Sequence, residues 1–285
     1  MGDYAVFHQL AWPAGYAVYF FISGISAALF FFSALSWFNE EYKPLRGSAF
    51  KLSFALLVLG GVLLVVDLSQ PLRFFYTLNP LFWNLRSPLV WGTILLVLFG
   101  AVSVGYHLAM ARADDKTARL LAVAGSVLAL SLPIYSGFDL AVHQHRPVWN
   151  TPLMPVLFVA LSLVSGAAVA SFLAKGDARL LARLRQIMLW TAGAVGVMLV
   201  SLLVTTAYGG AGEELTYLLM TSGMLGVVFV GLGGVLGTVA PIALLLAPMG
   251  RQAAGLQIAA ALLLVGGMAL RYAILIGPQI VQIYF

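Results

Sequence analysis

Eight long apolar segments, separated by short polar connections, organise this sequence. About 20 apolar residues span the hydrocarbon core of a bilayer, and a helix satisfies its backbone hydrogen bonds within the segment. The pattern therefore predicts an all-α membrane protein in which residues 1–285 form a single integral membrane domain with eight transmembrane helices. The expected helices cover approximately residues 13–38, 52–73, 88–111, 118–142, 152–174, 186–208, 215–246 and 252–276.

The seventh segment, 215–246, is longer than one bilayer crossing requires. Tilting the helix would absorb the excess, as would a bend near Gly233-Gly234 and Pro241.

Composition supports this interpretation. The chain is 62% hydrophobic and 9% charged, whereas soluble domains contain about 25% charged residues. The net charge of +5 lies in short connections and does not indicate nucleic-acid binding. The absence of cysteine excludes disulfides, thiolate-ligated iron–sulfur clusters and covalently attached c-type haem in this chain. Met1–Trp12 lacks a basic region, so no cleaved signal peptide is expected.

The basic residues are distributed unevenly between the two ends of the predicted helices. The first, third, fifth and seventh connections between helices hold most of them. The connections at the other end of the helices hold three, Arg73, Arg86 and Arg146. The positive-inside rule predicts that the first, third, fifth and seventh connections are cytoplasmic and that both termini lie outside. The basic set is Lys43, Arg46, Lys51, Arg112, Lys116, Arg119, Lys175, Arg179, Arg183, Arg185 and Arg251.

Three charged residues, Asp67, Asp139 and Arg271, lie inside the apolar segments. A charge at the bilayer centre costs about 2.5–3.5 kcal/mol on the mildest scale, so each one needs a functional or structural reason. One explanation is proton, ion or redox chemistry. The other is that the charges pair with one another and hold helices together.

Tyrosines accompany these charges in the predicted outer leaflet. Tyr135 and Asp139 are one turn apart on one helix face, and Tyr16 and Tyr19 share a face at the start of the first helix. Six polar side chains from four helices thus fall at a similar depth, although an interfacial aromatic belt also places tyrosines there.

Histidine ligation receives little support. Haem b needs two histidines facing each other on different helices, and His8, His107, His143 and His145 share no depth inside the membrane. A metal site at His143-Gln144-His145 would lack a further Cys or carboxylate ligand, apart from Asp139.

Two connections on the predicted outer side, 73–87 and 143–152, are rich in aromatic residues, Asn, Pro and Arg. Flat rings with hydrogen-bond donors at their edges suit a planar ligand head group, and they equally suit an interfacial belt. The connections on the other side are short, so we expect a protein partner at the outer surface.

Several stretches resemble one family, and they keep its order along nearly the whole chain. They are YFFISGISAALF (19–30), DLSQPLRF (67–74), SPLVWGT (87–93), YSGFDLA (135–141), WNTPLMPVLF (149–158), SGAA (165–168), GVLGTVAPIALLL (234–246) and GGMALRYAILIGPQ (266–279). Together they are similar to the NrfD/PsrC family, the polysulfide-reductase-type membrane subunits of quinone-linked oxidoreductases.

The resemblance implies two four-helix bundles with both termini outside, in a bacterial or archaeal cytoplasmic membrane. It implies a menaquinone or ubiquinone site near the outer face and no haem or iron–sulfur cluster in this chain. It also implies a ferredoxin-like iron–sulfur partner, joined by a molybdopterin catalytic subunit or a multihaem cytochrome c. The expected function is a membrane anchor that exchanges electrons between quinone and that partner, with or without proton translocation.

The resemblance also assigns roles to single residues. Tyr135 matches the tyrosine that hydrogen-bonds the quinone, Asp67 the acidic residue ending the second helix, and Arg271 the arginine of the last helix. Some members offer His or Asn from the first helix, where this chain has Tyr19 and Tyr16. We therefore expect quinone binding by Tyr135, Tyr19, Tyr16 and Asp67.

Proton transfer is expected to involve Asp67, Arg271 and Asp139. The competing interpretation is a secondary transporter, because eight spans with buried charges and Gly/Pro-interrupted helices also occur in transporters. A transporter, however, is expected to bind its substrate near the midplane, whereas these charges lie towards one face.

Overall fold

The computed structural model describes residues 12–66, 76, 79–144, 146 and 148–280. Every regular element in this part of the chain is helical, and eight helical segments are long and apolar enough to cross a membrane. The predicted all-α membrane protein with eight spanning segments is thereby confirmed. The segments are α1 (Ala14–Leu35), α2 (Leu45–Val66), α4 (Pro88–Ala111), α5 (Asp115–Ala141), α6 (Leu153–Leu173), α7 (Ala178–Ala207), the continuous α9–η5–α10 (Gly223–Gly226, Val227–Val239 and Ala240–Leu246) and α11 (Ala253–Ile280).

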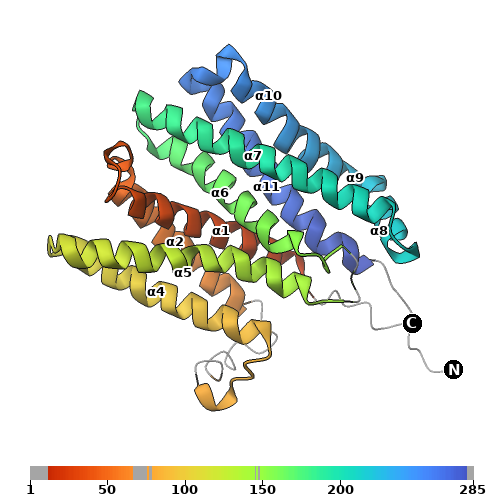
Figure 1. The fold of residues 1–285 in the computed structure, drawn as a ribbon, viewed down its shortest axis with the longest axis horizontal. Helices are drawn as coiled ribbons and strands as arrows, with labels where there is room; N and C mark the ends of the chain where they lie inside the picture. Colours follow the sequence, from red (N-terminus) through yellow and green to blue (C-terminus); the bar gives the residue numbers. More distant parts are fainter. Residues whose placement is uncertain (1–11, 67–75, 77–78, 145, 147, 281–285) are drawn as a thin grey trace.

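The long helices run side by side, with the first half of the chain (red to yellow in Figure 1) next to the second half (green to blue). Helix α1 packs against α2, α5 and α6, and α11 packs against η5, α6 and α1. As a result α1, α6 and α11 are buried along most of their length, whereas α2, α4 and α7 expose most of theirs. Charged side chains on the three central helices therefore meet protein rather than lipid.

Three helices begin earlier than the apolar pattern predicted. Helix α2 begins at Leu45 rather than 52, α5 at Asp115 rather than 118, and α7 at Ala178 rather than 186. The Asp177 carboxylate caps α7 by accepting hydrogen bonds from the backbone N–H groups of residues 179 and 180, at 3.0 and 3.1 Å. Apolar periodicity marks only the hydrocarbon-embedded part of a helix, and long basic side chains let the helix continue into the interface.

The excess length of the seventh segment is explained by a break between two helices. A separate helix, α8 (Ala211–Thr221), ends before Ser222, which is extended, and Gly223, whose φ of +58° favours glycine. The spanning segment then begins at Gly223 and has 24 residues, so the expected helix from 215 is wrong at its start. The part around Gly233-Gly234 is the π-helix η5, which continues into Pro241 of α10.

Candidate functional site

A cavity of about 160 Å³ lies at the end of the molecule where α1 and α4 begin and α2 and α5 end. Its walls are mostly aromatic or aliphatic, and its polar groups are three phenols, one hydroxyl and one carboxylate. The lining residues are Trp12, Tyr16, Tyr19, Phe20, Leu64, Leu89, Gly92, Thr93, Tyr135 and Asp139.

The first wall comes from the start of α1. Tyr16, Tyr19 and Phe20 share one face of α1, and Trp12 lies just before the helix begins. The rings of Trp12 and Tyr16 meet edge to face with centroids 4.8 Å apart. Phe20 packs behind the wall, edge to face with Phe158 of α6 at 5.5 Å. Edge-to-face packing holds the rings in place, so this wall is well ordered before any ligand arrives.

The opposite wall comes from the end of α5. Tyr135 and Asp139 are one helical turn apart and both face the cavity. Pro133, inside α5, removes one backbone hydrogen bond just before this turn. Neither the Tyr135 hydroxyl nor the Asp139 carboxylate has a hydrogen-bond partner in the described part of the chain, although Asp139 is only 3% exposed.

Buried polar groups are normally hydrogen-bonded, because leaving a buried donor or acceptor without a partner costs roughly 1–3 kcal/mol, and more for a charged group. The buried Asp139 carboxylate therefore points to a ligand or water that completes it, and the half-buried Tyr135 hydroxyl faces the same space. This is the observation that makes the cavity a candidate binding site.

The position of the Tyr135 ring depends on Gly92 of α4. A β-carbon at residue 92 would overlap the ring carbons and the hydroxyl of Tyr135. Any other residue would therefore push the phenol out of its place. The stretch SPLVWGT was noted in the sequence. Its contact between Gly92 and the Tyr135 ring could not be predicted, because the two residues lie on different helices.

The wall formed by Trp12 is fixed from the far end of the chain. The Gln279 side chain at the end of α11 accepts a hydrogen bond from the Trp12 backbone N–H and donates one to the Trp12 carbonyl, both at 3.0 Å. The connection between α5 and α6 fastens to the same end of α11. Arg146 donates to the Pro278 carbonyl at 2.8 Å, and the Trp149 indole donates to the Ile274 carbonyl at 2.6 Å.

His143 belongs to this wall as an aromatic group. Its ring contacts Trp12 and Trp149 edge to face, at 6.2 and 5.5 Å. His145, the other histidine of the metal site considered above, lies outside the described residues. Among the residues that the structure describes, no three His, Cys, Asp or Glu side chains gather closely enough to hold a metal ion.

The predicted site residues thus divide into three groups. Tyr16, Tyr19, Tyr135 and Asp139, proposed from three- and four-residue helical spacings and from depth, line one cavity. Asp67 lies outside the described residues, directly after the end of α2. Arg271 does not line the cavity.

Arg271 is instead enclosed in the centre of the molecule with no exposed surface. Its guanidinium donates to the Gly267 carbonyl at 3.0 Å and to the Ser162 hydroxyl of α6 at 3.3 Å, and it lies 5.4 Å from the Phe21 ring centroid. No carboxylate in the described part of the chain forms an ion pair with it. Of the expected pairing among the three buried charges, that of Arg271 with Asp139 is not found, and any pairing with Asp67 lies outside the described residues. The Arg271 Nε has no hydrogen-bond partner in the described part of the chain either.

The residues that sequence reasoning missed are mostly apolar or lack a side chain. Trp12, Phe20, Leu64, Leu89, Gly92 and Thr93 complete the cavity. Helical spacing could have revealed Phe20, which lies one turn after Tyr16, but not Trp12, which lies before the start of α1. Nothing in the order of residues could have paired Gln279 with Trp12.

The cavity suits a flat, uncharged molecule that carries carbonyl or hydroxyl oxygens. Phenols donate hydrogen bonds to such oxygens, and aromatic walls cover a ring. Among the described residues no Lys or Arg lines the cavity, which favours an uncharged ligand. Leu89, which is 56% exposed, lies at the rim and opens it towards the outside of the helical assembly. The volume is below the roughly 300–1,000 Å³ of pockets that enclose a whole ligand, so it fits a head group whose tail stays outside.

The fold and the cavity together define a polytopic helical membrane protein with a mostly aromatic cavity at one end of its helices. Residues 4–283 match the family described as polysulphide reductase, NrfD. The match covers nearly the whole chain, so the protein belongs to this family and the predicted resemblance is confirmed.

Individual relatives agree with the family. The protein is 28% identical over 187 residues to the C component of polysulfide reductase from Wolinella succinogenes, covering 58% of each sequence. It is 26% identical over 199 residues to the C component of tetrathionate reductase from Salmonella typhimurium, covering 67% of this sequence and 57% of that one. It is 28% identical over 194 residues to the protein NrfD of Escherichia coli, covering 58% and 59%. The aligned part thus spans less than two thirds of the length of these relatives.

Proposed function

We propose that this protein is the quinone- or quinol-binding membrane subunit of a multi-subunit respiratory oxidoreductase. In this role it anchors the complex and exchanges electrons between the membrane quinone pool and an iron–sulfur or cytochrome c partner. The observation that carries the proposal is the cavity at the start of α1, where the Tyr135 hydroxyl and the Asp139 carboxylate lack partners within an aromatic enclosure, as far as the chain is described. Membership of the NrfD family supports it, as do the names of the polysulfide and tetrathionate reductase relatives.

A quinone would supply two-electron, two-proton chemistry at the site. In the proposed mechanism the Tyr135 hydroxyl donates a hydrogen bond to one ring oxygen and orients the head group. Tyr16 and Tyr19 offer further donors from the facing helix. The Asp139 carboxylate accepts a proton from a bound hydroxyl, or delivers one in the reverse direction, because it faces the same enclosed space. Asp67 remains a proposed proton carrier, and Arg271 has no contact with the cavity to support that role.

The rim of the cavity supports access from the lipid. Leu64 of α2 and Leu89 of α4 line it, and both belong to peripheral helices that expose most of their surface. A long isoprenoid tail could therefore remain among the lipid tails while the head group enters. A soluble substrate would gain nothing from an entrance of this kind.

The wider arrangement is also inferred. The grouping of α1, α2, α4 and α5 beside the helices of the second half is consistent with two four-helix bundles (Figure 1). The basic end, formed by the connections after α1, α4, α6 and α10, is proposed to be cytoplasmic, which puts both termini and the cavity outside. The iron–sulfur partner, with a molybdopterin or multihaem cytochrome subunit, would then dock above the cavity.

The direct test of quinone binding is extraction of the purified complex followed by mass spectrometry of the extract. We expect quinone to be retained by the unaltered protein. In Tyr135→Phe, quinone-linked turnover should fall by at least about tenfold, since one hydrogen bond to the ring oxygen is lost. Reduction of the partner's clusters by its own substrate should be unaffected.

Tyr208→Phe is the matched control, because Tyr208 lies at the same end of the molecule, at the end of α7, and is 87% exposed. It should leave turnover unchanged. Absence of bound quinone, together with normal turnover in Tyr135→Phe, would overturn the proposal and favour a transporter.

The position of the partner can be tested by cross-linking. A probe introduced at Asn84 or Asn150, in the connections beside the cavity, should capture the partner subunit. A probe placed in 112–119, at the basic end, should not. Capture only by the second probe would contradict both the proposed orientation and the proposed docking face.

A further inference from the structure

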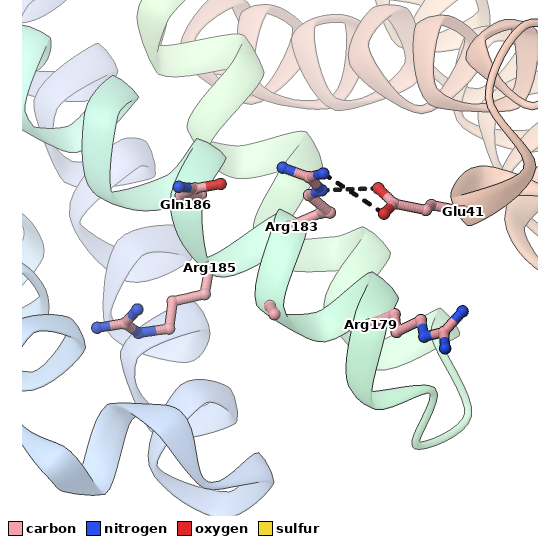
Figure 2. A pocket seen from close by; sticks show the side chains of 6 residues that line it. Glu41, Arg179, Arg183, Arg185 and Gln186 are labelled. Carbon is pink, nitrogen blue, oxygen red and sulfur yellow. Dashed lines mark hydrogen bonds and ion pairs between the residues drawn. The ribbon is translucent and has the colours of Figure 1, made fainter.

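The basic end of the molecule has two hollows, one on each side of the first turns of α7. Figure 2 shows the first: Arg183 turns towards Glu41 of η2 (Glu40–Tyr42), while Arg185 points to the other side of the helix. The Arg183–Glu41 ion pair has its closest atoms 2.7 Å apart. This hollow, of about 350 Å³, therefore already contains a counter-ion for one of its arginines.

The second hollow, of about 360 Å³, lies between the start of α7, the short helix η6 (Pro248–Arg251) and the start of α11. Its polar rim has two arginines, Arg185 and Arg251, and no acidic residue among those that the structure describes lines it. Its floor is apolar, with the buried Leu181 and Leu256. The nearest helix cap, Asp177, is engaged with backbone N–H groups of α7 and is not part of the lining.

Arg185 is held in place before any ligand arrives. Its Nε, at 2.9 Å, and its Nη2 both donate to the Leu245 carbonyl near the end of α10. This leaves Nη1 with no hydrogen-bond partner in the described part of the chain. A fixed guanidinium loses less conformational entropy on binding an anion than a mobile one. Arg251 is exposed and forms no ion pair among the described residues.

We propose that this second hollow binds the head group of an anionic phospholipid, with the phosphate between Arg185 and Arg251. The acyl chains would leave over Leu181 and Leu256 into the bilayer. Arginine prefers phosphate oxygens because its planar fork donates two parallel hydrogen bonds. Basic pockets between transmembrane helices on the cytoplasmic side are where such head groups bind.

The positive-inside rule explains why arginines gather at this end but not why two of them border a hollow with a leucine floor. The combination of a charged rim and an apolar floor matches an amphiphile rather than a free anion. The proposal does not depend on the quinone site, which lies at the opposite end of the helices.

The test uses the purified full-length protein, delipidated and then titrated with phosphatidylglycerol, phosphatidylcholine or inorganic phosphate while bound lipid is counted by native mass spectrometry. We expect phosphatidylglycerol to bind in preference to phosphatidylcholine. Arg251→Gln should weaken phosphatidylglycerol binding about fivefold, the effect of one basic residue near a membrane surface. Arg185→Gln should weaken it further but also breaks the bond to α10, so Arg251→Gln is the decisive variant.

Arg119→Gln is the matched control. Arg119 is an exposed arginine near the start of α5, at the same end of the molecule, and it lines neither hollow. The Arg119→Gln variant should bind phosphatidylglycerol as tightly as the unaltered protein does. An equal loss of phosphatidylglycerol binding in Arg251→Gln and Arg119→Gln would show diffuse electrostatic attraction to the surface and would overturn the proposed site. No preference over phosphatidylcholine would overturn it too, and so would competition by millimolar phosphate, which would indicate a soluble anion.

Discussion

Asp139 and Arg271 are both charged residues enclosed among apolar helices, yet their surroundings differ. Asp139, on α5, faces a cavity and finds no hydrogen-bond partner within the described part of the chain. Arg271, on α11, is sealed between α1 and α6 and donates to Gly267 and Ser162. The comparison teaches that burial cost alone does not identify a functional charge. What distinguishes the two charges is whether the group faces a cavity that a ligand can enter.

The first prediction addresses the charge that faces the cavity. Asp139→Asn has nearly the same shape but cannot exchange a proton, so quinone-linked turnover should fall by about 10²–10⁴-fold, the usual contribution of a general acid or base. Quinone retention, measured by extraction, should change little. Asp115→Asn, at the other end of the same helix, is the control. Unchanged turnover in Asp139→Asn would contradict a proton-transfer role for Asp139 and remove the functional difference from Arg271.

The second prediction tests the shape of the cavity through two glycines of α4. Gly92→Ala places a methyl group against the Tyr135 ring, whereas a methyl group at Gly100 meets nothing within 4 Å. Forced repacking costs about 1–3 kcal/mol, so quinone turnover should fall by about tenfold in Gly92→Ala. Gly100→Ala should be neutral or stabilising, because alanine favours helix. Equal behaviour of the two variants in turnover and melting experiments would contradict the assigned seat of Tyr135.

The third prediction concerns the wall of the cavity rather than its chemistry. Gln279→Leu removes both hydrogen bonds to the Trp12 backbone, worth about 0.5–1.5 kcal/mol each. Because Gln279 positions Trp12 and does not line the cavity, the KM for quinol should rise several-fold with kcat nearly unchanged. Gln279→Glu, which keeps the acceptor, should give an intermediate KM. A fall in kcat with constant KM would argue against a positioning role.

The smallest effect is expected at Arg271. A buried charge without an ion-pair partner is costly, and Arg271 forms no ion pair among the described residues. Arg271→Met should therefore keep turnover within about twofold and the melting temperature unchanged or higher. Steady-state turnover and thermal unfolding of the same preparation provide the measurement. A folded variant that has lost turnover would instead give Arg271 the proton-transfer role that the family resemblance implied.

Much of this protein could be predicted from the sequence because a bilayer imposes simple rules. The length of each apolar run predicted eight spanning segments, and the spacing of Tyr135 from Asp139 and of Tyr16 from Tyr19 placed each pair on one face. Depth alone then grouped them correctly, since all four line one cavity. Short motifs along the sequence predicted the NrfD family, and the match over residues 4–283 confirmed it.

Depth could not distinguish Arg271 from the other members of the group. It lies on the predicted helix but away from the cavity lining, among contacts with Ser162 and Phe21. Hydropathy also missed the start of α7, because arginines that reach into the interface continue a helix without an apolar signal.

The sequence by itself determined the membrane class, the eight spans, the family and the helix faces that carry the polar side chains, because these depend on local length and period. Only the tertiary structure decided which faces meet. Gly92 seats Tyr135 from another helix, Gln279 holds Trp12 across 267 residues of sequence, and Arg185 borders a hollow completed by Arg251. These pairings depend on the packing of helices that are distant along the chain, and no local pattern encodes that packing.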